Sequence, residues 1–200
     1  MSIKPKRENH VASRIPAQQR PETEFARPLR VGYGARSLAV LRIVMGLVFL
    51  WPFADKLFGL GYSTPSAGAW IRGGSPTRGF LSTVDVGPFA SMFHAWAGTW
   101  WADWLFMLSL LGVGVAVIAG AGLRIAAVAG TVLMLLMWAA EWPPARTTGA
   151  GTATHSSNPI FDYHLVFALV LIGLAAAFAG DTWGLGRRWA ALIGTRTWLR

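Results

Sequence analysis

The sequence predicts an all-α integral membrane protein: a four-helix bundle with a long, partly helical or re-entrant outer loop between helices 1 and 2. Two properties of the composition support this class. Hydrophobic residues make up 54% of the chain and charged residues only 14%, whereas a soluble domain carries about 25% charged residues. The mean hydropathy is +0.43. The order of the residues adds a third observation, since the apolar residues fall into a few uninterrupted blocks.

Four of these blocks have the ~20 residues that are needed to cross ~30 Å of hydrocarbon. They cover residues 37–60, 96–120, 123–142 and 159–180. The 35 residues between the first two blocks are too many for a simple turn and too apolar for a free linker. We therefore expect this connection to form a cap or a re-entrant element over the helices.

The remaining residues flank the membrane domain, which we expect to span residues 36–182. Residues 1–35 contain four prolines and many charges, which predicts a flexible cytoplasmic tail. Residues 183–200 are short and basic, which is typical of an amphipathic segment at the cytoplasmic surface.

Several residues in the spans are expected to have structural roles. Pro52 lacks a backbone N–H, so the first span is expected to kink there. Asn158 and Pro159 fit a helix N-cap followed by proline at the first helical position. Gly112 in the second span and Gly130 in the third lie in stripes of small residues, which let helices pack closely in lipid.

The distribution of Lys and Arg predicts the orientation. Thirteen of the 18 basic residues lie on the side of the termini and four on the opposite side. By the positive-inside rule, both termini are cytoplasmic in a prokaryotic plasma membrane. Arg42, which lies inside the first span, can extend its guanidinium toward the cytoplasm. The net charge of +9 therefore reflects topology in a lipid bilayer, and no nucleic-acid partner is expected.

The same topology brings seven ionisable residues to the outer end of the helices. Charged groups beside a transmembrane segment are costly to insert, so they are candidates for function. The alternative is that helix ends meet water and carry charge without any task. The seven residues are Asp55, Lys56, His94, Asp103, Glu141, Asp162 and His164.

Four of the seven are the candidate catalytic residues: His94, Glu141, Asp162 and His164. The chain has no cysteine, which excludes thiol nucleophiles and iron–sulfur ligation. Two histidines without a spacing motif give no evidence for a metal, a haem or a flavin. These residue types fit a quinone headgroup better, because it needs two hydrogen-bond partners, a proton route and flat aromatic walls.

Four stretches of the chain resemble the DoxX/DoxD-like membrane protein family. LRIVMGLVFLWPFADKLFG is similar to the opening pattern of DoxX-type proteins, with Arg42, Gly46 and Lys56 at its characteristic positions. AWIRGGSPTRGFL, NPIFDYHLVFALVLIGLA and AGDTWGLGRRW are similar to DoxD-type members, including the membrane subunit of thiosulfate:quinone oxidoreductase. The resemblance covers about residues 36 to 190.

The resemblance implies a four-helix membrane fold and electron transfer from an outer-side sulfur compound to quinone. Lys56, Arg72 and Arg78, together with Arg146, would then attract a small anionic substrate such as thiosulfate. His94, Asp162 and His164 would handle protons near the quinone. The family's activity is attributed to a complex with a second subunit, so a second redox subunit or a larger membrane complex is an expected partner.

Another class of function stays open, namely a noncatalytic membrane scaffold or accessory subunit of a larger complex. Some members of the DoxX family are thought to link other redox proteins at the membrane. A proton or ion pathway is disfavoured, because the cytoplasmic half of the spans offers only Arg42 and Arg124 as ionisable groups.

Overall fold

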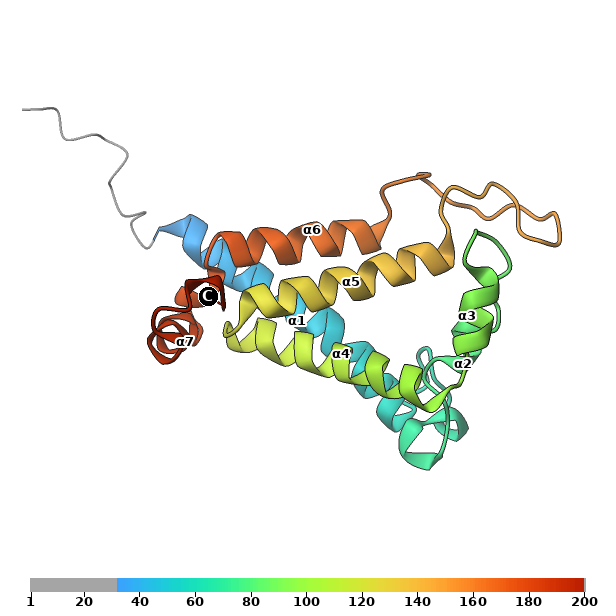
Figure 1. The fold of residues 1–200 in the computed structure, drawn as a ribbon, viewed down its shortest axis with the longest axis horizontal. Helices are drawn as coiled ribbons and strands as arrows, with labels where there is room; N and C mark the ends of the chain where they lie inside the picture. The colour runs from blue at the N-terminus through green and yellow to red at the C-terminus, as the bar shows by residue number, and fades with distance from the viewer. Residues whose placement is uncertain (1–31, 200) are drawn as a thin grey trace, which may run out of the picture. The chain divides into compact units, whose positions relative to one another are not determined.

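The computed structural model describes residues 32–199, so the expected tail at residues 1–35 lies almost wholly outside the described part of the chain. Within residues 32–199 every regular element is a helix and no strand is formed. The four longest helices lie alongside one another (Figure 1), and we call them the helix bundle. They are α1 (Tyr33–Phe58), α4 (Trp100–Ala119), α5 (Leu123–Glu141) and α6 (Tyr163–Ala176).

Among the described residues, three helices are long and apolar enough to cross a bilayer: α1, α4 and α5. Their bounds lie within about four residues of those expected from the apolar blocks, and α1 continues through Pro52 to Phe58. The fourth apolar helix, α6, has only 14 residues. The described part of the chain is therefore helical, and three of its helices have the length and apolar composition of membrane-spanning helices.

The start of α6 corrects one expectation. Asp162, not Asn158, is the N-cap, and its side chain accepts a hydrogen bond from the Leu165 amide. The Asn158 side chain instead accepts bonds from the amides of Ile160 and Phe161 at 2.9 Å each. Asn158 thus closes a turn, which is the other conformation that its short amide side chain favours.

Two helix pairs make up the bundle, α1 with α4 and α5 with α6, and α4 joins them by packing on α5. In Figure 1 the two pairs diverge toward the end that carries α2 and α3. The interior is apolar and draws on all four helices, with Phe49, Val113, Met134 and Leu171 among its buried members. This packing buries one stripe of each helix and leaves the opposite stripe to lipid.

Glycines set how closely the helices approach, although not all those expected to do so. A side chain at Gly130 would collide with Leu171 and crowd Val113, so α5 packs closely there. A side chain at Gly112 would meet nothing within 4 Å, so its expected packing role is wrong. α1 and α4 instead approach each other closely at Gly46 and Gly114, where a side chain on either glycine would crowd the backbone oxygen of the other.

The connection between α1 and α4, residues 59–99, folds into a structure that we call the cap. It contains α2 (Arg78–Leu81), α3 (Ala90–Trp96) and the short 3-10 turns η2 (Ser66–Gly68) and η3 (Trp70–Arg72). Val84 and Phe93 of the cap pack near Ala140 of α5. The cap therefore bridges the two helix pairs at this end, which we call the cap end.

Two buried aspartates fasten the cap to the bundle. Asp55, 1% exposed, accepts bonds from the Tyr62 and Ser63 amides and from the Ser63 hydroxyl at 2.7–3.2 Å. Asp103, 7% exposed, accepts bonds from the Ser75 hydroxyl and from the amide and hydroxyl of Thr77 at 2.6–3.0 Å. Asp55 uses both of its oxygens in these bonds, and Asp103 uses Oδ1 for all three.

The opposite end, which we call the terminal end, carries η4 (Ala179–Asp181), α7 (Gly186–Ile193) and η5 (Thr197–Leu199). Arg42 is fully buried there. Its guanidinium donates to the carbonyls of Val117 and Ile118 at the end of α4, and to the Trp183 carbonyl at 2.9 Å. Arg42 thus adds a donor to carbonyls at the end of α4, one of which, that of Val117, also accepts from the Gly120 amide.

Candidate functional site

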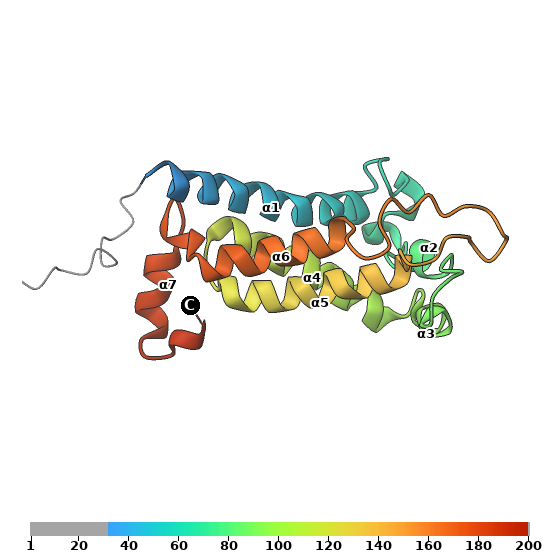
Figure 2. The same ribbon diagram turned by 90° about the horizontal axis from the view of Figure 1, so that it is seen from above.

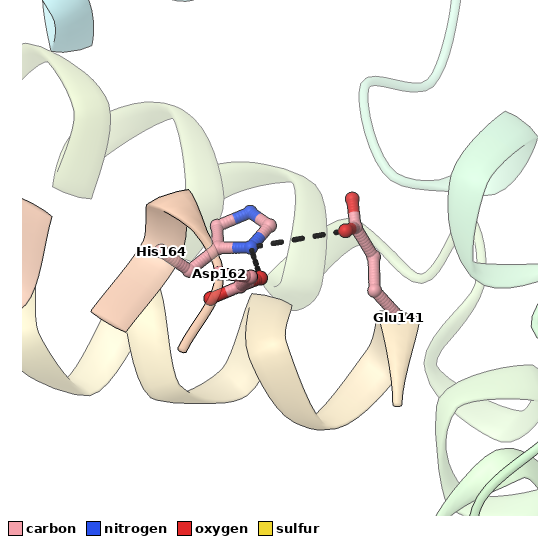
Figure 3. A group of neighbouring side chains, drawn as sticks. All are labelled: Glu141, Asp162 and His164. Carbon is pink, nitrogen blue, oxygen red and sulfur yellow. Dashed lines mark hydrogen bonds and ion pairs between the residues drawn. The ribbon is translucent and has the colours of Figure 1, made fainter. Parts of the chain in front are cut away.

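The end of α5 and the start of α6 bring four polar side chains together at the cap end. Glu141 is the last residue of α5, and Trp142, with φ of 43°, ends the helix. Asp162 caps α6, so Tyr163 and His164 occupy its first turn. Because α5 and α6 pack along each other, the two helix ends meet (Figure 3). We call Glu141, Asp162, Tyr163 and His164 the His164 cluster.

Two hydrogen-bonded pairs, Asp162 with His164 and Tyr163 with Glu141, lie side by side in the cluster. His164 Nδ1 lies 2.7 Å from Asp162 Oδ2 and 3.9 Å from Glu141 Oε2 (Figure 3). The Tyr163 hydroxyl donates to Glu141 Oε1 at 2.7 Å. Asp162 engages both of its oxygens, since the other one caps the helix.

The histidine tautomer follows from these contacts. An ionised carboxylate only accepts hydrogen bonds, so Nδ1 of a neutral His164 carries the hydrogen and Nε2 keeps a free lone pair. Nε2 is buried and has no hydrogen-bond partner among the described residues. In Figure 3 it points away from the two carboxylates. A buried polar atom without a partner is unusual and calls for an explanation.

Exposure rises steadily along the cluster. The side chain of His164 is 1% exposed, that of Asp162 13% and that of Glu141 35%, while Tyr163 is 52% exposed. The cluster therefore runs from a buried nitrogen to the surface. Proton exchange between the buried pair and the surface pair would have to cross the 3.9 Å between His164 Nδ1 and Glu141 Oε2.

A cation is the other ligand that these groups suit. One donor atom from each of Glu141, Asp162 and His164 lies within 4.8 Å of the others, and imidazole with carboxylates binds several first-row metals. Binding through Nδ1 would displace the hydrogen that this nitrogen gives to Asp162. The hydrogen-bonded arrangement and a metal-bound arrangement therefore exclude each other.

The other predicted residues lie outside this cluster. His94 is exposed on α3, and its Nε2 lies 2.6 Å from the Val84 carbonyl oxygen. Its contact is therefore within the cap. Lys56 is half-buried near the end of α1, with its Nζ 5.9 Å from the centre of the Phe106 ring.

The candidate anion-binding arginines are spread over the exposed surface. Arg72 donates to Ser66 within the cap, and the Arg78 guanidinium lies against Gly98. Arg146 lies in the loop between α5 and α6, where an open crevice of about 380 Å³ is lined by residues 143–146, 153–156 and 159. None of these three arginines contributes a donor to the His164 cluster.

Sequence reasoning missed two parts of this end. Tyr163 is not among the predicted site residues, although its hydroxyl donates a hydrogen bond to Glu141. The sequence signal that could have identified Tyr163 is its position next to His164 at the start of a helix. The loop partners of Asp55 and Asp103 had no local signal, since Ser75 lies 28 residues from Asp103.

Comparisons of the chain with protein-family models, curated proteins and solved structures find no match.

Proposed function

We propose that this chain is the membrane subunit of a redox system that passes electrons from a small reductant, such as thiosulfate, to quinone. The observation that carries the proposal is the unpartnered Nε2 of buried His164, whose Nδ1 is bound by Asp162 and lies 3.9 Å from the partly exposed Glu141. The resemblance to DoxX/DoxD-like proteins supports the same reading.

The proposal includes the topology. We propose that α1, α4, α5 and α6 all cross a prokaryotic plasma membrane, with the cap end outside and the termini in the cytoplasm. The apolar composition of all four helices and the excess of Lys and Arg near the termini support this arrangement. The His164 cluster would then lie at the outer interface, where a lipid-soluble quinone and a water-soluble reductant both have access.

The cluster suits a quinone headgroup for three reasons. Nε2 of His164 offers a hydrogen-bonding atom in an apolar setting, where such a bond is strong. Tyr163 and the His164 ring lie with centroids 4.0 Å apart and supply flat walls. Tyr163 is also about half exposed, which leaves one side of its ring open to a ligand. A bound quinone accepts two electrons and two protons, and the reductant supplies the electrons.

The residues of the chain would manage the protons. With its Nδ1–H held by Asp162, His164 can carry a second proton at Nε2 and donate it toward the ligand. Asp162 stabilises the charge that His164 gains in doing so. Glu141 is partly exposed, so it can exchange protons with the outer water beside the Nδ1 side of His164. Lys56, Arg72, Arg78 and Arg146 would attract an anionic reductant to this side.

Steady-state kinetics of the purified complex test the proposal. We expect His164→Ala to lower reductant-dependent quinone reduction by about 100-fold or more, and Asp162→Asn by about tenfold, because general acid–base groups contribute factors of this size. The exposed His155→Ala is the matched control and should retain the rate. Full activity in well-folded His164→Ala would overturn the proposed site.

A noncatalytic scaffold is the second candidate, and the cap favours it. The cap exposes Tyr62, Ile71 and Phe89 by 45–76% while its own polar contacts are satisfied, which suits a rigid docking surface. If the chain is a scaffold, His164→Ala should change neither the assembly nor the activity of the whole complex. It fails instead when Ile71 and Phe89 are changed together to serine, which the redox proposal expects to be harmless to quinone binding.

A further inference from the structure

The C-terminal segment, residues 182–199, has no part in the proposed redox site, yet it is firmly placed. It follows η4 and contains α7 and η5. Figure 2 shows α7 running across the end of the bundle, roughly at right angles to the bundle helices. A helix with this direction lies parallel to the plane of any bilayer that the bundle crosses. The segment therefore lies near the depth where hydrocarbon gives way to headgroups.

Several contacts hold the segment in this position. The Leu185 amide donates to the Ala119 carbonyl at 2.8 Å, and Arg42 donates to the Trp183 carbonyl at 2.9 Å. The Trp189 ring lies beside Gly122 at the start of α5. Its indole N–H donates to the Leu199 carbonyl at 2.8 Å. These contacts leave α7 with one face on the protein and one face turned outward.

The outward side combines large apolar side chains with positive charge. Leu192 is 81% exposed and Trp198 is 69% exposed. Arg187, Arg188 and Arg196 are also exposed, and residues 182–199 contain no acidic residue. Tryptophan and leucine beside arginine are the residue types of segments that bind the membrane interface.

We propose that residues 182–199 bind anionic lipid of the leaflet around the terminal end. Leu192 and Trp198 enter the interface, and the three arginines bind headgroup phosphates. Two observations favour lipid over a protein partner. The terminal end of the bundle also exposes apolar side chains, with Ile125 51% and Phe178 41% exposed. The charge is of one sign and opposite to that of an anionic leaflet, which attracts such segments.

Site-directed spin labelling tests the placement, because the chain has no cysteine of its own. The full chain carries Leu192→Cys with a nitroxide, in nanodiscs of phosphatidylcholine with and without phosphatidylglycerol. We expect the label to be more accessible to oxygen than to a water-soluble nickel complex. The ratio of oxygen to nickel accessibility should be higher in nanodiscs that contain phosphatidylglycerol. Ala191→Cys, one position away and about 100° around α7, is the matched control and should favour nickel. Equal nickel access at both positions would overturn the proposal.

Lipid selectivity tests the role of the arginines. Native mass spectrometry of the full chain from mixed micelles gives the ratio of retained phosphatidylglycerol to phosphatidylcholine. We expect this ratio to fall when Arg187, Arg188 and Arg196 are replaced together by glutamine. The upper limit of the fall is roughly fivefold for each arginine removed. Arg146→Gln, exposed at the cap end, is the control and should leave the ratio unchanged. An unchanged ratio in the triple variant would contradict the proposal, and neither outcome depends on the redox site.

Discussion

Two groups of carboxylates lie at the same end of the bundle and differ in exposure and in the kind of donor that they bind. Asp55 and Asp103 are buried, and each accepts three hydrogen bonds from amides and hydroxyls of the cap. Glu141 and Asp162 are partly exposed and bind the side chains of Tyr163 and His164. The first group holds loop residues in place, so it fixes structure. The second lies beside the unpartnered Nε2 of His164, so it has capacity for a ligand.

The difference shows that a charge near the membrane is not by itself evidence of a site. All seven outer-end residues were equal candidates by position. Their partners separate them, because Asp55 and Asp103 hold amides and hydroxyls of the cap, whereas Asp162 holds the imidazole of His164. The same test places His94, whose contact is within the cap, outside the proposed proton route.

The largest effect is expected from breaking the cap attachment. Asp103→Ala leaves the Thr77 amide and two hydroxyls without their partner, so we expect it to destabilise the fold by about 3 kcal/mol or more. Thermal unfolding in detergent measures this loss. The control is Asp85→Ala, an exposed carboxylate that accepts one bond from the Gly149 amide. If both variants unfold at the same temperature, Asp103 does not fasten the cap.

Helix packing provides the next largest effect. Gly130→Leu puts a side chain against Leu171 and Val113, and overpacking of this kind costs about 1–3 kcal/mol. Gly112→Leu has the same added volume but points into open space, so its unfolding temperature should match the parent protein. Equal destabilisation by both changes would show that α4 packs at Gly112 after all.

The positions of the helices were predictable, and the contacts between them were not. Uninterrupted apolar runs located α1, α4 and α5 to within a few residues. The start of α6 was misplaced, because Asn158-Pro159 suits both a helix cap and a turn. The hydrogen bonds from the Ile160 and Phe161 amides to the Asn158 side chain show that it forms the turn. The partners of Asp103 and the role of Gly114 depend on residues far apart in the chain, for which the sequence has no local signal.

The candidate site was partly predictable, because the positions of the helix ends were predictable. Topology alone placed Glu141, Asp162 and His164 at one end, and the structure brings these three together. It also showed that Asp162 acts as the helix cap and contacts His164 at the same time. In a regular helix, residues two positions apart, such as Asp162 and His164, face different directions. The extended backbone of the capping residue removes that restriction.

A smaller effect distinguishes the two members of the proton route. Glu141→Gln keeps a partner for the Tyr163 hydroxyl but removes a group that can carry a proton. We expect a roughly tenfold slower quinone reduction, with unchanged thermal stability because Glu141 is partly exposed. Tyr163→Phe should slow the reaction less, since it removes only the partner. A larger loss in Tyr163→Phe would place the tyrosine, not Glu141, in the proton route.

The smallest effect expected is that of a chelator. The hydrogen bond from His164 Nδ1 to Asp162 and a metal bound at Nδ1 exclude each other, so EDTA should leave the quinone reduction rate unchanged. Activity that is lost in EDTA and restored by a divalent metal would replace the proton route with a metal site at the same three residues.

Nitrogen-15 NMR of histidine tests the central claim most directly. The chain has four histidines, so His164→Ala identifies the His164 signals in the labelled protein. We predict a protonated Nδ1 and a bare Nε2 in the free protein, and a shift of the Nε2 resonance when a short-chain quinone or quinol is added. His94 and His155 should not respond. Saturating ligand that binds without moving the His164 Nε2 resonance would contradict the account.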